Sequence, residues 1–415
     1  MRIKNINRVI SKVSLNYYNF VLVLSILSFV YLPLKIGILS DFIMLCMAIK
    51  EKLFKNLKIK PFFFFYIFWI LLSYIWMGGD RVSCMVMSFG YSILPMLFFI
   101  VGRKLPFDDR KSYFNTIITF IRIMLIMSMI LWLLMPDFYC EYLINKTWVA
   151  DKDRFVAKVE ARMCMQGFFG ATATGFFCAV LFLADLKKIL WNKFSKLTVS
   201  FFFLDIFFLV ANSRKSAMLV AFFLMVVEFV NYFKSKQTSS TRPAILLLIT
   251  AIFCFIFYCI GLYLHFDFKF FLNMLDRFSQ AGMDKAFSNR SNDNALALSN
   301  MKDYMYIVGN GFGSSGHKAD ESAGIFIYDN NWMLIFVETG VIGILLFIAA
   351  IIENVHKVVL NKRYYSLEFY IVFLGVLQSA TSNMLENQFV TPLFYFALGC
   401  CSSWRLCTTK GEIYE

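Results

Sequence analysis

Long apolar runs recur along almost the whole of this chain, and they restrict its fold more than any other feature. Of its 415 residues, 59% are hydrophobic and 16% are charged. A soluble domain of this size would place charged residues on the outer face of each helix, whereas the charges here gather between the apolar runs. A helix of about 20 apolar residues crosses the hydrocarbon core of a bilayer. We therefore predict an all-α, polytopic integral membrane protein.

About twelve transmembrane helices fit the sequence, and the whole chain, 1–415, is predicted to be a single transmembrane domain. The basic start of the chain leads into the first run without a small-residue cleavage site, which indicates a retained helix. The second run is short and carries Asp41. The predicted spans lie near residues 18–34, 36–49, 62–77, 83–101, 113–135, 164–184, 197–211, 216–233, 243–264, 331–352, 366–385 and 389–406.

The distribution of basic residues orients these spans. With a cytoplasmic amino terminus, the cytoplasmic segments hold 25 Lys and Arg residues and the short outer loops hold 4. Basic residues in short loops are retained in the cytoplasm, so both termini are predicted to be cytoplasmic. This bias also accounts for most of the formal net charge of +14, and no nucleic-acid partner is expected.

Two outer segments are too long to be turns: residues 136–163, and a large loop, 265–330, between the ninth and tenth helices. Both are polar and contain arginines. A guanidinium group suits a phosphate because its planar fork donates two hydrogen bonds and stays charged. An anionic substrate such as a pyrophosphate is therefore expected at the outer face. The candidate ligands are Arg162, Arg214, Arg277 and Arg290.

Simpler explanations exist for parts of this pattern. Arg214, in the short hairpin "ANSRKSAM", could extend to lipid phosphates, and the small residues that follow Arg162 could serve helix packing. The stretch "VGNGFGSSGH" lacks the lysine of a phosphate-binding loop, so it is interpreted as a tight outer turn that lets backbone approach a ligand. The ten cysteines show no metal-like spacing, and neither a metal site nor a cofactor is predicted.

The segment "YDNNWMLIFVETGVIG", residues 328–343, places three polar residues at the outer start of the tenth predicted helix. Asp329 is a candidate proton acceptor, because partial burial at a helix mouth raises a carboxyl pKa. A carboxylate in the first turn is also a favourable helix cap, which is the alternative. His317, in the preceding loop, is a second candidate base. Asn330 and Asn331 could orient Asp329 or bind substrate hydroxyls.

The order of these elements resembles the O-antigen polymerase and ligase superfamily of bacterial inner membranes. The resemblance covers about residues 160–350: a short outer "NSRKS" hairpin, a long outer loop with an arginine, "VGNGFG" and then "DNNWMLIFVETGVIGILL". Ligases begin the last element with His-Asn, whereas Asp329 stands in the place of the histidine here. An Asp-Asn start is more similar to the polymerases of the Wzy type.

The resemblance implies a metal-independent glycosyltransferase that joins repeat units on undecaprenyl diphosphate at the periplasmic face of the bacterial inner membrane. The terminal sugar hydroxyl of one lipid-linked unit attacks the anomeric carbon of the growing chain, and undecaprenyl diphosphate leaves. Arginines stabilise the leaving group and Asp329 or His317 accepts the proton. A chain-length regulator is the implied partner. An O-antigen ligase, or a flippase that transports lipid-linked oligosaccharides, is the alternative.

Overall fold

The computed structural model describes most of the predicted helical regions. In the residues that the structure describes, the chain is helical and contains no strand. Four helices there are long and apolar enough to cross a membrane, namely Cys84–Lys104, Arg110–Leu134, Lys215–Lys234 and Asn331–Leu360. The helical class is thus confirmed, while the twelve-helix count stays a prediction. The structure describes residues 36–50, 59–77, 81–105, 107–146, 165, 167–191, 195–212, 214–235, 288, 291–292, 294–315, 327, 330–360, 366–387 and 389–403.

The chain divides into two compact units, and each is described by itself. The first consists of Met1–Ile117 and Phe287–Glu412, and the second of Ile118–Ala286 and Ile413–Glu415. The boundary falls within one helix, α6, which runs from Phe107 to Leu134.

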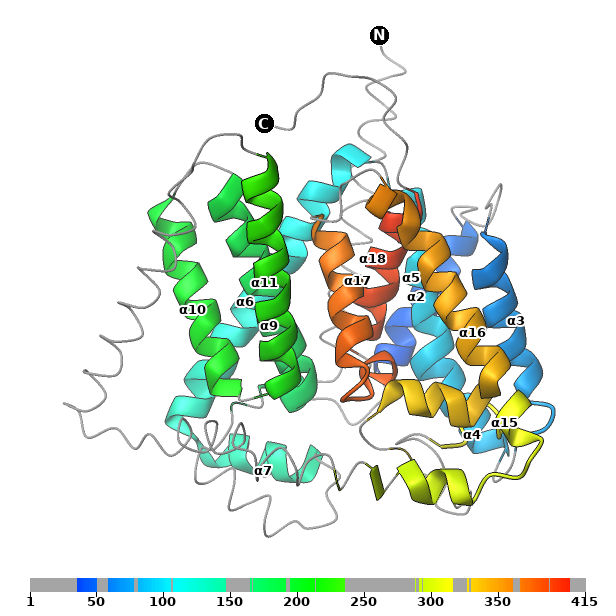
Figure 1. The fold of residues 1–415 in the computed structure, drawn as a ribbon. Coiled ribbons are helices and arrows are strands. Elements are labelled where there is room, and N and C mark those ends of the chain that lie inside the picture. Colours follow the sequence, from blue (N-terminus) through cyan, green and yellow to red (C-terminus); the bar gives the residue numbers. More distant parts are fainter. Residues whose placement is uncertain are drawn as a thin grey trace. The chain divides into compact units, whose positions relative to one another are not determined.

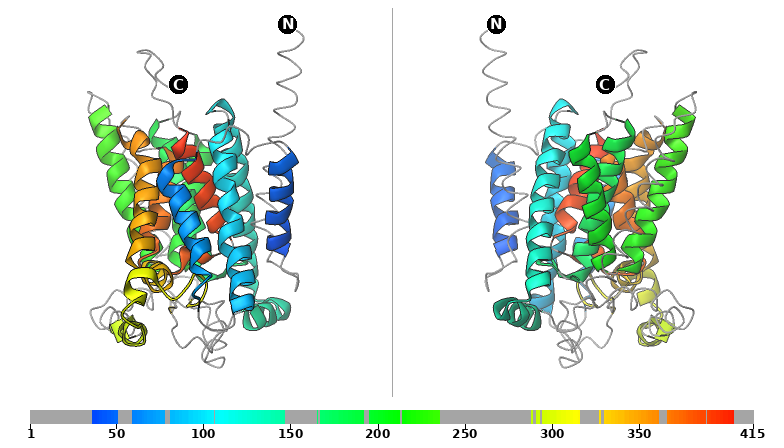
Figure 2. Two further views of the ribbon diagram at one scale, coloured as in Figure 1. Left: turned by 90° about the vertical axis from the view of Figure 1, so that its right-hand side faces the viewer. Right: turned by 90° about the vertical axis from the view of Figure 1, so that its left-hand side faces the viewer.

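In the first unit, α16 lies along α3, and α18 packs closely against α5 (Figures 1 and 2). Glycine makes the second contact possible, since a Cβ on Gly399 would lie 2.1 Å from the Phe99 carbonyl oxygen. The helices of this unit, besides the start of α6, are α2 (Ile36–Lys50), α3 (Pro61–Ser73), α4 (Arg81–Ser88), α5 (Leu97–Lys104), α15 (Met305–Val308), α16 (Asn331–Leu360), α17 (Leu367–Gln378) and α18 (Thr391–Ser402).

The predicted span 83–101 is helical throughout but irregular. A π-helical turn, η1 (Phe89–Ile93), and a 3-10 turn, η2 (Leu94–Met96), separate α4 from α5. Pro95 lies in the 3-10 turn, where its missing N–H and its ring interrupt the α-helical ladder. This break brings Ser92 and Met96 to the cavity described below.

The predicted span 331–352 forms the first part of α16, which continues to Leu360 and is kinked. Gly340 has φ 68° and ψ −172°, a conformation that side-chain-bearing residues rarely adopt. A Cβ at this position would lie 2.1 Å from the Ile307 carbonyl oxygen. Gly340 therefore allows both the kink and the close approach of the chain around α15.

The second unit packs the rest of α6 with α7 (Asp137–Lys146), α9 (Gly170–Trp191), α10 (Lys196–Asn212) and α11 (Lys215–Ser235). The first ten residues after Pro136 in the predicted outer loop 136–163 thus form α7. Helix α9 is buried along most of its length, with α10 and α11 against it (Figure 1).

A buried ion pair joins three helices of this unit. Arg122 on α6 donates to Asp185 on α9 at 2.5 Å and lies 3.5 Å from the nearer carboxylate oxygen of Asp205 on α10. Lys188 adds a second cation, 3.5 Å from Asp185. All the charges are balanced within the cluster, and its evident role is to hold α6, α9 and α10 together.

Candidate functional site

A buried carboxylate on the first turns of α16 lines a small cavity in the first unit. Glu338 is 1% exposed and Asn331 is 2% exposed. The two residues are seven apart, so they lie on one face of the helix, two turns from each other. Leu334 and Ile335 lie between them on that face and also line the cavity. The start of α16 therefore presents an amide and a carboxylate to the same space.

Side chains from five other parts of the unit complete the lining: α3, the irregular turns before α5, the loop 309–315, the segment between α17 and α18, and α18 itself. These side chains are Tyr66, Ser92, Met96, Phe312, Leu385, Glu386 and Tyr395. The empty space amounts to about 320 Å³, including the opening to solvent. The part in which the centre of a water molecule fits is about 20 Å³, enough to hold water.

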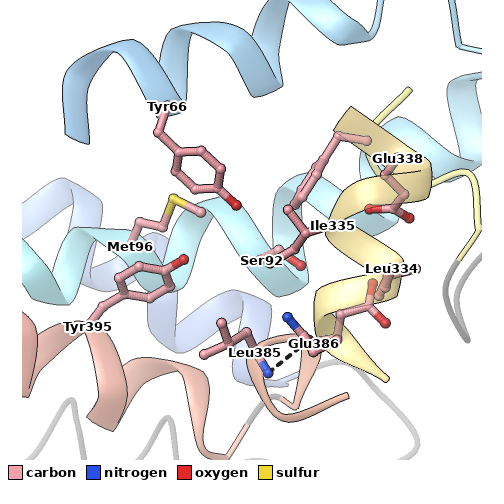
Figure 3. Close-up of a pocket in the computed structure, with 11 residues that line it drawn as sticks. Tyr66, Ser92, Met96, Leu334, Ile335, Glu338, Leu385, Glu386 and Tyr395 are labelled. Carbon is pink, nitrogen blue, oxygen red and sulfur yellow. Dashed lines mark hydrogen bonds between the residues drawn. The ribbon is translucent and has the colours of Figure 1, made fainter. Parts of the chain in front are cut away.

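Hydroxyl groups face this space from three directions. Figure 3 shows the hydroxyls of Tyr66 and Tyr395 directed toward the space beside Ser92, with Glu338 approaching from α16. The Ser92 hydroxyl is buried, and within the described part of the chain it has no hydrogen-bond partner. A buried hydroxyl without a partner loses free energy, so a polar guest in the cavity would stabilise it.

The glycine-rich loop 309–315 holds Glu338 in place. The Ser315 N–H donates to Glu338 Oε1 at 3.1 Å, and the Gly311 N–H donates to the Glu338 backbone oxygen at 2.9 Å. Gly309, with φ 80°, lies so close that a Cβ on it would be 2.2 Å from that oxygen. The stretch predicted to let backbone approach a ligand thus brings its backbone against α16.

The kink at Gly340 explains why backbone oxygens of α16 can accept hydrogen bonds from the loop. It interrupts the i→i−4 ladder and leaves the carbonyls of the preceding turn in need of other donors. The Asn310 N–H bonds the Val337 oxygen at 2.8 Å, and the Trp69 indole bonds the Thr339 oxygen at 2.9 Å. The kink, the loop and α3 therefore fix the Glu338 backbone together.

Of the predicted site residues, the structure places Asn331 at the cavity. The Asn331 side-chain oxygen accepts from the Leu385 N–H at 3.2 Å. The Asn331 backbone N–H donates to the Ser379 backbone oxygen at 2.8 Å. Asn330 instead caps α16, because its side-chain oxygen accepts from the Met333 N–H at 3.1 Å. Asn331 thus joins α16 to the segment before α18, while Asn330 starts the helix.

Arg214 belongs to the second unit, where it precedes α11 and its carbonyl accepts from the Met218 N–H at 3.1 Å. Its Cβ lies 3.2 Å from the point where a Cβ on Gly175 would be, so the glycine makes room for it. The other predicted site residues lie outside the described part of the chain, and their convergence on one substrate stays a prediction. They are Asp329, His317, Arg162, Arg277 and Arg290.

Glu338 was not among the predicted site residues, although the sequence carried a signal for it. It is the one acidic residue in the predicted span 331–352. An ionisable residue inside a span is a functional candidate by default, since burial in hydrocarbon is costly. Tyr66 and Tyr395 carried no comparable signal, because each lies in an aromatic-rich run typical of lipid-facing helices.

The cavity offers the chemistry of carboxylates and hydroxyls beside aromatic rings. Carboxylates accept hydrogen bonds from alcohols, and tyrosine and serine hydroxyls both donate and accept. Such a set suits an alcohol group of a polyhydroxylated ligand. Among the described residues, no three His, Cys, Asp or Glu side chains lie close enough together to hold a metal ion.

Comparisons with protein-family models, with curated proteins and with solved structures gave no match.

Proposed function

We propose that the chain is a glycan polymerase of the bacterial inner membrane that elongates O-antigen on undecaprenyl diphosphate. The observation that carries this proposal is the cavity of Glu338, which sets two carboxylates, those of Glu338 and Glu386, beside three hydroxyls at the start of α16. The resemblance in sequence assigns the reaction to the same element. The cavity supports the assignment because an acceptor sugar needs partners for its hydroxyls and an acceptor for one proton.

In the proposed reaction, an oxygen of the acceptor sugar forms a bond to the anomeric carbon of the donor glycan. The bond from that carbon to the diphosphate oxygen breaks, and undecaprenyl diphosphate carries away the electron pair. The proton of the attacking hydroxyl passes to a protein base. Fixed arginines stabilise the leaving group without reorganising, which is the proposed role of Arg162, Arg214, Arg277 and Arg290.

Three groups are candidates for the base: Asp329, His317 and, from the structure, Glu338. Asp329 and Glu338 are distinguishable by position. The helix between Asn331 and Glu338 rises roughly 10 Å, and Asp329 precedes it. We propose Asp329 and Glu338 as alternative bases, which substitution of each residue in turn distinguishes.

The proposal includes the predicted topology of about twelve spans, two periplasmic loops and cytoplasmic termini. The apolar helices of the structure support a membrane protein by their length and composition. Lipid-linked oligosaccharides are the proposed substrates, membrane lipid surrounds the chain, and a chain-length regulator is the proposed partner. No cofactor and no nucleic acid take part.

Reconstitution tests the proposal. The purified chain in vesicles with lipid-linked repeat units should form polymer in the presence of a chelator. Comparison of Glu338→Gln with Asp329→Asn then identifies the base, because only loss of the base should abolish bond formation. Asp303→Asn, at an exposed position of the same unit, is the matched control and should polymerise normally.

Other products would overturn the proposal. Movement of the lipid-linked unit across the vesicle membrane without polymer would identify a flippase. Transfer of finished polymer to lipid A core without elongation would identify a ligase.

A further inference from the structure

A cluster of cations surrounds Glu353 of α16, far from the cavity. Glu353, at the centre of the cluster, is fifteen residues after Glu338, which corresponds to roughly 22 Å along the helix. The cations come from three helices of the first unit: Lys60 directly precedes α3, Arg103 lies in the last turn of α5, and Lys357 lies on α16. The cluster is therefore separate from the proposed polymerisation site.

Hydrogen bonds fix Lys60 between α3 and α16. Its ammonium group donates to the Glu353 backbone oxygen, and the Phe62 N–H donates to the Glu353 carboxylate at 3.2 Å. His356 also contacts the Glu353 backbone oxygen, at 2.6 Å. The ammonium is half-buried as a result, although lysines at a membrane surface are normally free to extend into water.

The guanidinium groups nearby are fixed in the same way against the end of α18. Arg103 donates to the Ser402 hydroxyl at 3.0 Å. Arg110, which is 4% exposed, donates to the Cys400 oxygen at 3.0 Å and to the Ser403 hydroxyl at 2.5 Å. These hydrogen bonds hold both guanidinium groups at the end of α18.

Within the described residues, the charged neighbours of Lys60 are two cations and one carboxylate. The pKa of the Lys60 ammonium is lowered to about 8, mainly by burial and also by repulsion from Lys357 and Arg103, while Glu353 acts in the opposite direction. An added anion would relieve both the repulsion and part of the desolvation cost.

Apolar side chains border the cluster on the outside of the unit. Phe62 is 46% exposed and Ile352 is 61% exposed, and they lie within two residues of Lys60 and Glu353 respectively. A free phosphate gains nothing from contact with an apolar surface, whereas a phospholipid places its acyl chains against it. In the predicted orientation this end faces the cytoplasm, where basic sites between helices bind anionic headgroups.

We infer that the cluster of Lys60, Arg103 and Lys357 binds the phosphodiester headgroup of an anionic phospholipid, with its acyl chains over Phe62 and Ile352. The general excess of basic residues in cytoplasmic loops does not explain the arrangement. That rule requires only that lysines and arginines stay on one side, not that they be fixed by hydrogen bonds between helices.

Lipid titration of the purified full-length chain tests the inference. Phosphatidylglycerol should raise the unfolding temperature and remain bound in native mass spectrometry, while phosphatidylcholine should do neither to the same extent. Lys60→Gln and Arg103→Gln should each weaken phosphatidylglycerol binding about fivefold, since each removes one charge at the surface. Lys234→Gln, an exposed cation at the end of α11, is the control and should bind as the wild type does.

Lys60→Arg keeps the charge and should restore binding, so a folding defect in the glutamine variant leaves the test intact. Equal retention of phosphatidylglycerol by the wild type and both glutamine variants would overturn the inference. So would full displacement by millimolar inorganic phosphate, which would identify a site for a free anion. None of these measurements depends on polymerisation.

Discussion

Two regions of this chain bury charge, and they do so in opposite ways. In the second unit, Arg122 meets the carboxylates of Asp185 and Asp205, so charge is paired with charge. In the first unit, the Glu338 carboxylate accepts from a backbone N–H and borders a cavity lined by hydroxyls.

The difference teaches that a buried charge alone does not indicate a site. An ion pair inside a helical bundle joins helices, and removal of one partner leaves a costly uncompensated charge. A carboxylate held by backbone in a cavity with the Ser92 hydroxyl, which has no partner among the described residues, can accept a hydrogen bond from a guest. The two regions should therefore respond differently to the same kind of substitution.

The largest effect on activity is expected from Glu338→Gln. The amide keeps the shape of the side chain but accepts a proton poorly, so polymer formation should fall by roughly 10² to 10⁴-fold. Stability should change little, because the amide oxygen can still accept from Ser315. Initial rates with lipid-linked substrate and denaturation in mixed micelles measure the two quantities. Unchanged rates would remove Glu338 from the reaction.

Arg122→Met should lower stability and leave activity unchanged, which is the reverse of the result expected for Glu338→Gln. It leaves Asp185 and Asp205 buried without their main counter-charge, which is expected to cost about 3–5 kcal/mol of stability. Polymerisation per folded molecule should stay normal. The triple variant R122M/D185L/D205L should recover most of the lost stability, because an apolar replacement removes all three buried charges. If the triple variant were as unstable as the single one, the ion pair would have a role besides joining helices.

The sequence predicted helices in most of the regions that the structure describes, and one of its predicted site residues, Asn331, lines the cavity. Apolar length predicted a helix over 331–352, and the structure begins α16 at Asn331 as expected. The cavity itself could not be predicted, because Tyr66, Glu338 and Tyr395 are far apart in the sequence and come together only through packing of α3, α16 and α18. No periodicity tells which faces of apolar helices meet.

The kink in α16 also could not be predicted from the sequence. Gly340 leaves room for the close approach of Ile307. Its left-handed backbone conformation depends on the loop 309–315, which supplies donors for the freed carbonyls. A glycine within a helical run does not reveal such a partner.

Gly340→Ala should be the next most damaging change. Gly170→Ala, at the start of α9 in the other unit, is its matched control. Both glycines have positive φ, 68° and 77°, which costs an alanine about 1 kcal/mol. A Cβ on Gly170 meets nothing within 4 Å, whereas one on Gly340 would collide with the Ile307 oxygen. We expect a stability loss of about 2–4 kcal/mol and reduced polymerisation in Gly340→Ala only. Equal losses in both variants, measured by denaturation, would show that the contact with Ile307 is unimportant.

Two buried serines offer a smaller test of the same contrast. The Ser92 hydroxyl is without a partner among the described residues, so Ser92→Ala should leave stability unchanged or slightly higher. It should weaken acceptor binding about fivefold, as expected for one lost hydrogen bond. Ser128, in the second unit, donates to the Met124 oxygen at 2.8 Å and accepts from the Phe168 N–H at 3.3 Å. Ser128→Ala should therefore lose about 1–3 kcal/mol and bind acceptor normally.

The smallest expected effect concerns Lys60, whose charged form is disfavoured mainly by burial, whereas the charge of Arg122 is met by two carboxylates. Its folded pKa of about 8 lies below the ordinary 10.5, so between these values the unfolded chain binds more protons than the folded one. Stability should therefore rise with pH from about 8 to about 10.5 in phosphatidylcholine. A phosphodiester beside Lys60 would raise its pKa, so phosphatidylglycerol should flatten this rise, as should Lys60→Met, which has no group to titrate. Denaturation at a series of pH values measures the slope, and the same slope in both lipids would place the headgroup away from Lys60.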